Sequence, residues 1–497
     1  MRAASFTGAL LIVAALLTLA AWSLASPPGS SPDDDFHLPS IWCAGGTGET
    51  CAEDPAGSPD VRLLPARLVG APCFHFDGTV SASCQDALPD TMVPDTATSR
   101  GNWTGLYPPV FYAVMGLLVN DDLDDSILLI RAVNEMVVVG LVAALAALVP
   151  RRLRPVSVVP LLITSVPLGL SIFSSTNPSS WAIVSAAVVW PALYAAFERD
   201  GPRRWALLGL TLVAVVLGSG SRGDACLFSA MGICLALGLR FGQLRHHPAA
   251  LATGLGALAI SAYFLLNAGQ SGLVATGLPE ESLGIPWYDL AVLNLQQLPV
   301  LWFGGFGYGA LGSGGWFDTS FPALLVLALC VWAAVVFGGL REMDRLKLAA
   351  LTVVGLALTT YPLVVLGRTG VTVGTAFQPR YLMPVLVIFT GIALLPTARG
   401  QRLSKLQVLV LAAGLSVAQS LALATQIRRY VTGQDVTGFA LDRGKEWWWD
   451  LPVSAMFVWV VGSIAFLVLS LLAFQGYAAG QTPGTRDDDR GPLATAS

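Results

Sequence analysis

Apolar stretches of about 17 to 25 residues alternate with short polar segments along most of the chain. About 20 apolar residues in a helix cross the roughly 30 Å hydrocarbon core of a bilayer. The pattern predicts about twelve transmembrane helices, over 4–24, 126–149, 155–174, 180–197, 205–218, 225–240, 250–267, 320–340, 347–367, 381–397, 405–426 and 455–475. Two further apolar segments, 106–119 and 289–307, are short, proline-broken or amphipathic, so we expect interfacial or re-entrant helices there.

Basic residues recur after every even-numbered span. They are Arg151, Arg152, Arg154, Arg199, Arg203, Arg204, Arg240, Arg245, Arg341, Arg345, Lys347, Arg399, Arg402 and Lys405. The positive-inside rule then places both termini in the cytoplasm. We therefore expect a transmembrane domain over 1–475 with three extracytoplasmic loops, 25–125, 268–319 and 427–454. The polar, Gly/Pro-containing tail 476–497 is expected to be disordered and cytoplasmic.

The composition supports an all-α polytopic membrane protein. Of 497 residues, 54% are hydrophobic and only 12% are charged, whereas a soluble protein carries about a quarter charged residues. There is no basic stripe or recognition module for nucleic acid. HExxH, CxxC and P-loop motifs are also absent, so we predict no metal or nucleotide site, although a divalent ion held by acids stays an open alternative. The excess of arginine over lysine and the abundant alanine favour a bacterial plasma membrane as the location.

Four cysteines lie together in the first long loop: Cys43, Cys51, Cys73 and Cys84. In an oxidising compartment they predict two disulfides, with three pairings open and unpaired thiols as the alternative. The first apolar stretch has a second interpretation as a signal peptide, because the small residues 23–26 suit cleavage.

Three consecutive acids, Asp33, Asp34 and Asp35, follow the first span and precede His37. Helix capping is the simple explanation, since acids complement the positive end of a helix. One acid would suffice for a cap, however, and a carboxylate at the membrane surface can act as a general base. His37 lies one helical turn away, where it is either structural or able to orient a carboxylate or bind a phosphate.

Other polar residues cluster at the same expected side. Arg131 and Asn134 share one face of the second span, where the arginine either snorkels or binds a lipid phosphate. The acids at 121–125 precede that span, and Asp125 and Ser126 are expected to cap it. Asn177 belongs to an Asn-Pro turn.

Later loops add further charges. Arg222 and Asp224 stand at one turn and are expected to pair, and Arg380 directly precedes a span, where its guanidinium suits a phosphate. Tryptophans 447–449 form either an aromatic belt or a sugar-stacking platform.

Six short motifs in order resemble a known family. They are PDDDFH (32–37), YPPVFY (107–112), IRAVN (130–134), STNPSS (175–180), SRGDA (221–225) and QPRYLMP (378–384). Together they resemble a large family of bacterial polytopic membrane proteins of unknown function that is grouped with the GT-C glycosyltransferases. The chain departs from the family pattern at Asp34, where glutamate is common.

The resemblance implies a GT-C-like helical bundle that uses a polyprenyl-phosphate-linked sugar donor at the outer face. It transfers the catalytic role of a first-loop acid to Asp33 or Asp34. The motifs also supply candidate substrate-binding residues, namely His37, Tyr107, Arg131, Asn134, Asn177, Arg222, Asp224, Arg380 and Tyr381. The expected acceptor is a cell-envelope glycan or lipid, reached with inversion at the anomeric carbon.

Two other classes of function stay open. A transporter or flippase of a lipid-linked glycan would carry ionisable groups deep in its spans, which are scarce here. A non-catalytic envelope-assembly protein would not depend on the acids at all. The outer-side acids and arginines favour the enzyme.

Overall fold

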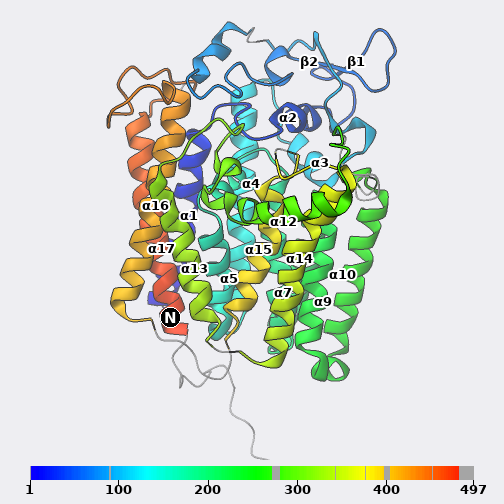
Figure 1. Cartoon of the computed structure of the whole chain (residues 1–497), viewed down its shortest axis with the longest axis vertical. Helices are drawn as coiled ribbons and strands as arrows, with labels where there is room; N and C mark the ends of the chain where they lie inside the picture. Colours follow the sequence, from blue (N-terminus) through cyan, green and yellow to red (C-terminus); the bar gives the residue numbers. More distant parts are fainter. Residues whose placement is uncertain are drawn as a thin grey trace, which may run out of the picture.

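The computed structural model describes residues 2–88, 91–270, 272, 280–341, 343–374, 376–396, 403–449 and 451–480 (Figure 1). Within these residues, eight helices are long and apolar enough to cross a membrane. They are α1 (Arg2–Leu24), α4 (Leu123–Leu148), α7 (Ser179–Ala196), α8 (Gly201–Ser219), α10 (Pro248–Asn267), α14 (Arg345–Thr369), α16 (Lys405–Val431) and α17 (Ala455–Gly480). All eight coincide with predicted spans.

The other four predicted spans are shorter or interrupted, so the number twelve is not confirmed. Three are apolar helices of limited length: α9 (Gly223–Leu239), η8 with α13 (Ala323–Leu325, Val326–Gly339) and α15 (Pro379–Ala393). The prediction of one helix over 155–174 is wrong, because α5 (Arg154–Thr164) and α6 (Leu168–Phe173) are separate. Pro167 lies between them and has no N–H to continue the helical hydrogen-bond ladder.

Residues 25–122 cover one end of the bundle, which we name the loop end (Figure 1). This segment contains α2 (Asp34–Trp42), α3 (Val110–Gly116) and a small antiparallel sheet of β1 (Ala52–Glu53), β2 (Arg62–Leu64) and β3 (Thr96–Thr98). Short 3-10 helices η1 (Ala66–Leu68), η2 (Ala82–Ala87) and η3 (Asn102–Thr104) connect them. The two predicted disulfides are confirmed and pair Cys43 with Cys51 and Cys73 with Cys84.

The first loop is fastened to two later segments by a buried ion pair. The Arg429 guanidinium on α16 contacts the Asp318 carboxylate at 3.0 Å, and the side chains are 0% and 1% exposed. The same guanidinium donates to the carbonyls of Phe74 and Val80, both at 2.6 Å. The segment closed by the Cys73–Cys84 disulfide is thus held against α16 and the 313–321 loop.

The opposite end gathers the basic segments. Glu198, just after α7, pairs with both Arg152 and Arg240, which follow α4 and α9. The Lys347 ammonium donates to the carbonyls of Gly339 and Leu395 at 2.9 and 3.0 Å, which joins the ends of α13 and α15 to the start of α14. The predicted alternation of helix ends is therefore consistent with the contacts at this end.

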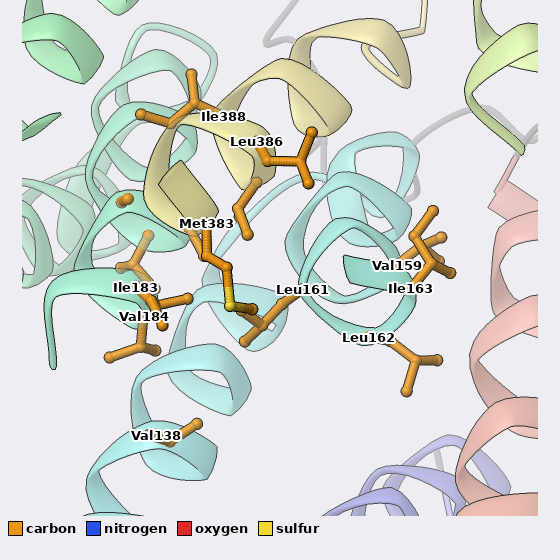
Figure 2. Close-up of a cluster of buried hydrophobic side chains, with 14 of the residues drawn as sticks. Val138, Val159, Leu161, Leu162, Ile163, Ile183, Val184, Met383, Leu386 and Ile388 are labelled. Carbon is orange, nitrogen blue, oxygen red and sulfur yellow. The ribbon is translucent and has the colours of Figure 1, made fainter. Parts of the chain in front are cut away.

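The core lies among α4, α5, α7 and α15, beneath the loop end. Figure 2 shows Val138, Leu161, Ile183 and Met383 pointing into this region from the four helices. The helix α7 is buried along its whole length. A Cβ on Gly391 of α15 would lie 2.8 Å from the indole of Trp190, so a glycine is required for this close approach of α15 to α7.

The segments expected at the surface are short helices. The interfacial helix predicted at 106–119 is only α3, because Pro108 and Pro109 delay its start. The helix α12 (Trp287–Phe303) lies across the bundle (Figure 1) and is not among the helices suited to span a membrane.

The helix α17 continues five residues past its predicted end, to Gly480, so residues 476–480 are helical and not part of the predicted tail. Residues 481–497 lie outside the described residues.

Candidate functional site

The acid cluster is positioned by Arg131 on α4. Its guanidinium is fully buried and donates to the carbonyls of Ser23, Ser26 and Pro27 at 2.9, 2.5 and 3.1 Å. Burial shows that this arginine does not snorkel to the surface. Since both terminal nitrogens hold backbone carbonyls at the end of α1, we assign Arg131 the role of positioning the turn that carries the acids.

Asp33 occupies the N-cap position of α2, yet its side chain makes no capping hydrogen bond. The capping hydrogen bond considered for this acid is therefore not formed, while Asp34 and Asp35 lie in the first turn of the helix. Its backbone has φ 63°, in the left-handed region that Asp tolerates better than most residues. This conformation lets the Asp33 carbonyl accept from the N–H groups of Phe36 and His37 at 2.9 Å while its carboxylate turns to another partner.

The partner of the Asp33 carboxylate is Arg380, at the first turn of α15. The arginine side chain is 1% exposed and the aspartate side chain is 31% exposed. Arg380 Nη2 also donates to the Tyr381 hydroxyl at 3.1 Å, whereas its Nε and Nη1 are buried without a hydrogen-bond partner among the described residues. Burial alone would raise the pKa of the Asp33 carboxyl, but the positive charges around it, chiefly Arg380, hold that pKa below its usual value.

Asp34 points elsewhere and is completely buried. Its carboxylate accepts from the Thr176 hydroxyl at 2.6 Å and from the Ser31 N–H at 3.1 Å. Burial raises the pKa of this carboxyl to about 6, even though Arg131 and the two hydrogen bonds act against the rise. A carboxylate with no exposed surface cannot meet a substrate hydroxyl, so of the two candidate bases the geometry favours Asp33.

Asp35 takes a third direction and pairs with Arg100 at 2.5 Å. The three adjacent carboxylates thus diverge to three different partners. A divalent cation needs several oxygen ligands that converge on one point. Among the described residues no group of three or more His, Cys, Asp or Glu side chains is placed to hold a metal ion, so this donor set does not fit one.

His37 lies on α2 one turn beyond the acids and is buried. Its Nδ1 is 2.9 Å from the Tyr112 hydroxyl, and its Nε2 is buried with no partner in the described part of the chain. Burial lowers the pKa of the imidazole to about 3, so the ring is neutral at physiological pH. A neutral ring can donate or accept one hydrogen bond at Nε2, depending on the tautomer.

A second arginine lies beside the first. Arg222 forms a bidentate pair with Asp224, both contacts at 2.9 Å, as predicted from the sequence. Its guanidinium lies 4.9 Å from the Tyr381 ring centroid and 5.6 Å from that of Tyr107. The Arg380 guanidinium contacts the same Tyr381 ring at 5.1 Å. Both cations therefore lie against the Tyr381 ring. The charge of Arg222 is neutralised by Asp224, whereas Arg380 forms its ion pair with the partly exposed Asp33.

Arg380 lines a narrow pocket of about 30 Å³, which we name the Arg380 pocket. Its wall includes Pro32 from the turn before the acids, the backbone of residues 312–315, and the aromatic side chains of Phe317 and Phe321. The combination of one buried guanidinium, a glycine-rich backbone segment and apolar side chains suits a ligand with an anionic head and an apolar tail.

The remaining candidates support the cluster from behind. Asn134 donates to the carbonyls of Phe173 and Ser175, and Asn177 donates to the carbonyl of Pro32 at 2.9 Å. Both asparagines are fully buried. They fix the 175–180 turn against the acid-bearing segment, which is a positioning role.

Two loop expectations change. The N-cap of α4 is Asp122, whose carboxylate accepts from the Asp125 N–H at 2.9 Å, rather than Asp125 or Ser126. Trp449 is not part of an aromatic belt: it is buried, donates to the carbonyl of Leu24 at 3.0 Å and stacks near Arg131.

Sequence reasoning missed four residues of the site. Thr176 and Tyr112, the partners of Asp34 and His37, both lie inside motifs that had been singled out for other residues, so their hydroxyls were a usable signal. Arg100 lies in a loop with no pattern to indicate it. Glu135 on α4 is buried, and its Oε1 lacks a hydrogen-bond partner in the described residues; its place directly after Asn134 in an apolar span was the available signal.

Comparison with known families gives one match. Residues 16–389, about three quarters of the chain, match the model of a family described as "Predicted membrane protein (DUF2142)". No curated protein matches the chain.

Proposed function

The chain belongs to the DUF2142 family of predicted membrane proteins, and from this premise and the geometry at the loop end we propose that it is a membrane glycosyltransferase of the GT-C type. It transfers a sugar from a polyprenyl-phosphate donor to an envelope glycan or lipid on the extracytoplasmic face. The observation that carries the proposal is the meeting of Asp33 and Arg380, 347 residues apart in the chain, at the edge of a pocket.

Arg380 is the proposed phosphate ligand. Two of its N–H groups, at Nε and Nη1, are buried without a partner in the described residues, which is costly unless a ligand completes them. Each of these nitrogens can donate a charge-assisted hydrogen bond to a phosphate oxygen, which is stronger than a hydrogen bond between neutral groups. The apolar part of the Arg380 pocket would receive the first carbons of the lipid.

Asp33 is the proposed base. In the ion pair its pKa is low, which makes it a weak base. When a donor phosphate binds Arg380, a negative charge is added beside Asp33, and a nearby like charge raises the pKa of a carboxyl. Donor binding would therefore strengthen the base at the moment when an acceptor is needed.

The transfer balances as a single displacement. The acceptor hydroxyl oxygen forms a bond to the anomeric carbon while the bond from that carbon to the phosphate oxygen breaks, with inversion. The hydroxyl proton passes to the Asp33 carboxylate. The leaving group is the polyprenyl phosphate, and Arg380 stabilises the negative charge that develops on it.

Binding of a lipid phosphate is the first test. Farnesyl phosphate and farnesol, which differ only in the phosphate, would be titrated into the protein in nanodiscs. We expect Arg380→Ala to weaken farnesyl phosphate binding roughly tenfold or more, since a hydrogen bond to a charged group contributes about 1.5–3 kcal/mol. Arg443→Ala, which removes an exposed loop-end arginine, is the matched control and should bind like wild type. Equal binding of both ligands, or no effect of Arg380→Ala, would refute the phosphate site.

Transfer is the second test, and it separates the enzyme from the alternatives. With radiolabelled polyprenyl-phosphate sugars, Asp33→Asn should abolish transfer and retain farnesyl phosphate binding. A flippase of lipid-linked glycan would instead move the donor between leaflets of a vesicle without making a new glycosidic bond. An assembly protein would show no dependence on Asp33 in either assay.

A further inference from the structure

A second pocket of about 340 Å³ lies within the first loop, beyond the C-terminal end of α2; we name it the loop pocket. Its wall brings together the Cys43–Cys51 disulfide, Arg62 of β2, Trp103 of η3 and Tyr112 of α3. Its volume is in the usual range for a small-molecule site. None of the proposed donor-binding residues lines it.

The Trp103 indole is held in one orientation. Its Nε1 donates to the Asp60 carbonyl at 3.0 Å. The ring also lies directly on the backbone of Gly101, where a Cβ would come within 1.9 Å of the indole carbon Cζ3. Only glycine at position 101 leaves room for the indole, so this residue is required for the observed orientation of Trp103.

The polar groups of the loop pocket are also fixed in advance. Arg62 Nη1 donates to the carbonyls of Val61 and Pro59 at 2.8 and 3.2 Å, and its guanidinium lies 5.9 Å from the Trp103 ring centroid. The Ser40 hydroxyl accepts from the Asn102 N–H at 2.9 Å and donates to the Phe36 carbonyl, which fixes its orientation.

This combination of groups fits a carbohydrate. A sugar ring presents an apolar face of C–H groups and a rim of hydroxyls. An aromatic ring in a fixed orientation can stack on the apolar face of the sugar. The guanidinium and hydroxyl groups beside it can form hydrogen bonds with the sugar hydroxyls. A lipid chain would require a continuous apolar lining, and the polar groups of Arg62, Ser40 and Thr47 interrupt it.

The loop pocket is connected to the acid cluster through α2 and His37. Asp33 is at the first end of this nine-residue helix, and Cys43 in the pocket wall directly follows the other end. Nine helical residues span about 13 Å. Tyr112 lines the pocket, and its hydroxyl lies 2.9 Å from Nδ1 of His37. His37 is on α2, between Asp33 and the loop pocket.

We propose that the loop pocket is a carbohydrate-binding subsite that holds the acceptor glycan at a distance from the reacting hydroxyl. The acceptor role rests on the proposed glycosyltransferase function, whereas carbohydrate binding does not. Because about 13 Å separates the pocket from Asp33, an acceptor anchored here would have more than one sugar unit.

Saturation-transfer difference NMR on the full chain in nanodiscs tests the subsite. The probes are methyl glycosides of a hexose, a pentose and an N-acetylhexosamine, each compared with the corresponding disaccharide. We expect at least one disaccharide to bind more tightly than its methyl glycoside. Trp103→Ala should weaken it by roughly three- to tenfold, in line with the contribution of an aromatic contact.

Two glycine variants provide the matched comparison. Gly101→Ala displaces the indole and should weaken saccharide binding, whereas Gly48→Ala, whose Cβ would meet open space in the same loop, should not. Far-UV circular dichroism of each variant reports whether the helical bundle is intact, and Arg380→Ala should leave saccharide binding unchanged.

The results separate this proposal from the glycosyltransferase proposal. Saccharide binding that needs Trp103, in a protein that does not bind farnesyl phosphate, would support the subsite and overturn the donor site. No saccharide signal from folded wild type, or a signal that survives both Trp103→Ala and Gly101→Ala, would overturn the subsite. Binding of farnesol or of an unglycosylated peptide in a Trp103-dependent manner would overturn it as well.

Discussion

Replacement of Asp34 by asparagine should change how the stability of the protein depends on pH. Burial raises the pKa of this carboxyl from 3.8 to about 6. Each pH unit of displacement corresponds to about 1.4 kcal/mol, so ionising Asp34 costs the folded state about 3 kcal/mol. Because the folded-state pKa lies above the unfolded one, the stabilisation from the protonated carboxyl is complete below about pH 3.8. It is lost as the pH rises through about 6.

The assay is thermal unfolding in nanodiscs, followed by tryptophan fluorescence from pH 4 to pH 7, for wild type and Asp34→Asn. The difference in Tm between the two proteins should move in favour of the variant as the pH rises, by on the order of 3 °C. Other groups titrate equally in both proteins and cancel in the difference. Parallel curves would refute the assignment of a buried, raised carboxyl. Asp34→Asn should also retain transfer activity, unlike Asp33→Asn.

Two further substitutions test the packing that positions the site. Asp318→Asn leaves the buried guanidinium of Arg429 without its carboxylate, so we expect the free energy of unfolding to fall by about 3–5 kcal/mol. Hydrogen exchange should increase first in residues 71–84, and a uniform increase along the chain would contradict this prediction. Gly391→Ala places a Cβ 2.8 Å from the Trp190 indole and should cost about 1–3 kcal/mol. Gly355→Ala, with open space around its Cβ, is the control, and equal Tm values for the two glycine variants would count against the close α15–α7 contact.

The hydrophobic pattern was sufficient to predict where most helices lie. Every predicted span contains helix because an apolar segment in a bilayer has to satisfy its backbone hydrogen bonds internally. The pattern failed at 155–174, because hydropathy does not register the effect of Pro167 on the helical ladder. The two disulfides followed from the number and location of the cysteines, whereas their pairing depends on the fold of the loop.

The sequence predicted which residues belong to the site, but not which of them contact each other. Sequence order gave Asp33 and Arg380 as candidates, but nothing local indicates that they meet. Adjacent acids also look equivalent in the sequence. They have different partners because the backbone of Asp33, with φ 63°, turns its carboxylate away from that of Asp34. Arg131 was expected either to snorkel or to bind a lipid phosphate, and only the fold shows the three carbonyls that it holds.

The ion pair between Asp33 and Arg380 also sets the order of events during biosynthesis. Its two members are 347 residues apart, and at about 5–20 residues per second the ribosome needs roughly 20 to 70 s to pass from one to the other. During that interval the first loop and all four of its disulfide cysteines have been synthesised, while the Asp33 carboxylate still lacks the arginine. Oxidative folding of the loop therefore has time to finish before the charged site exists, and a chain truncated before α15 would carry a folded loop with an unpaired acid.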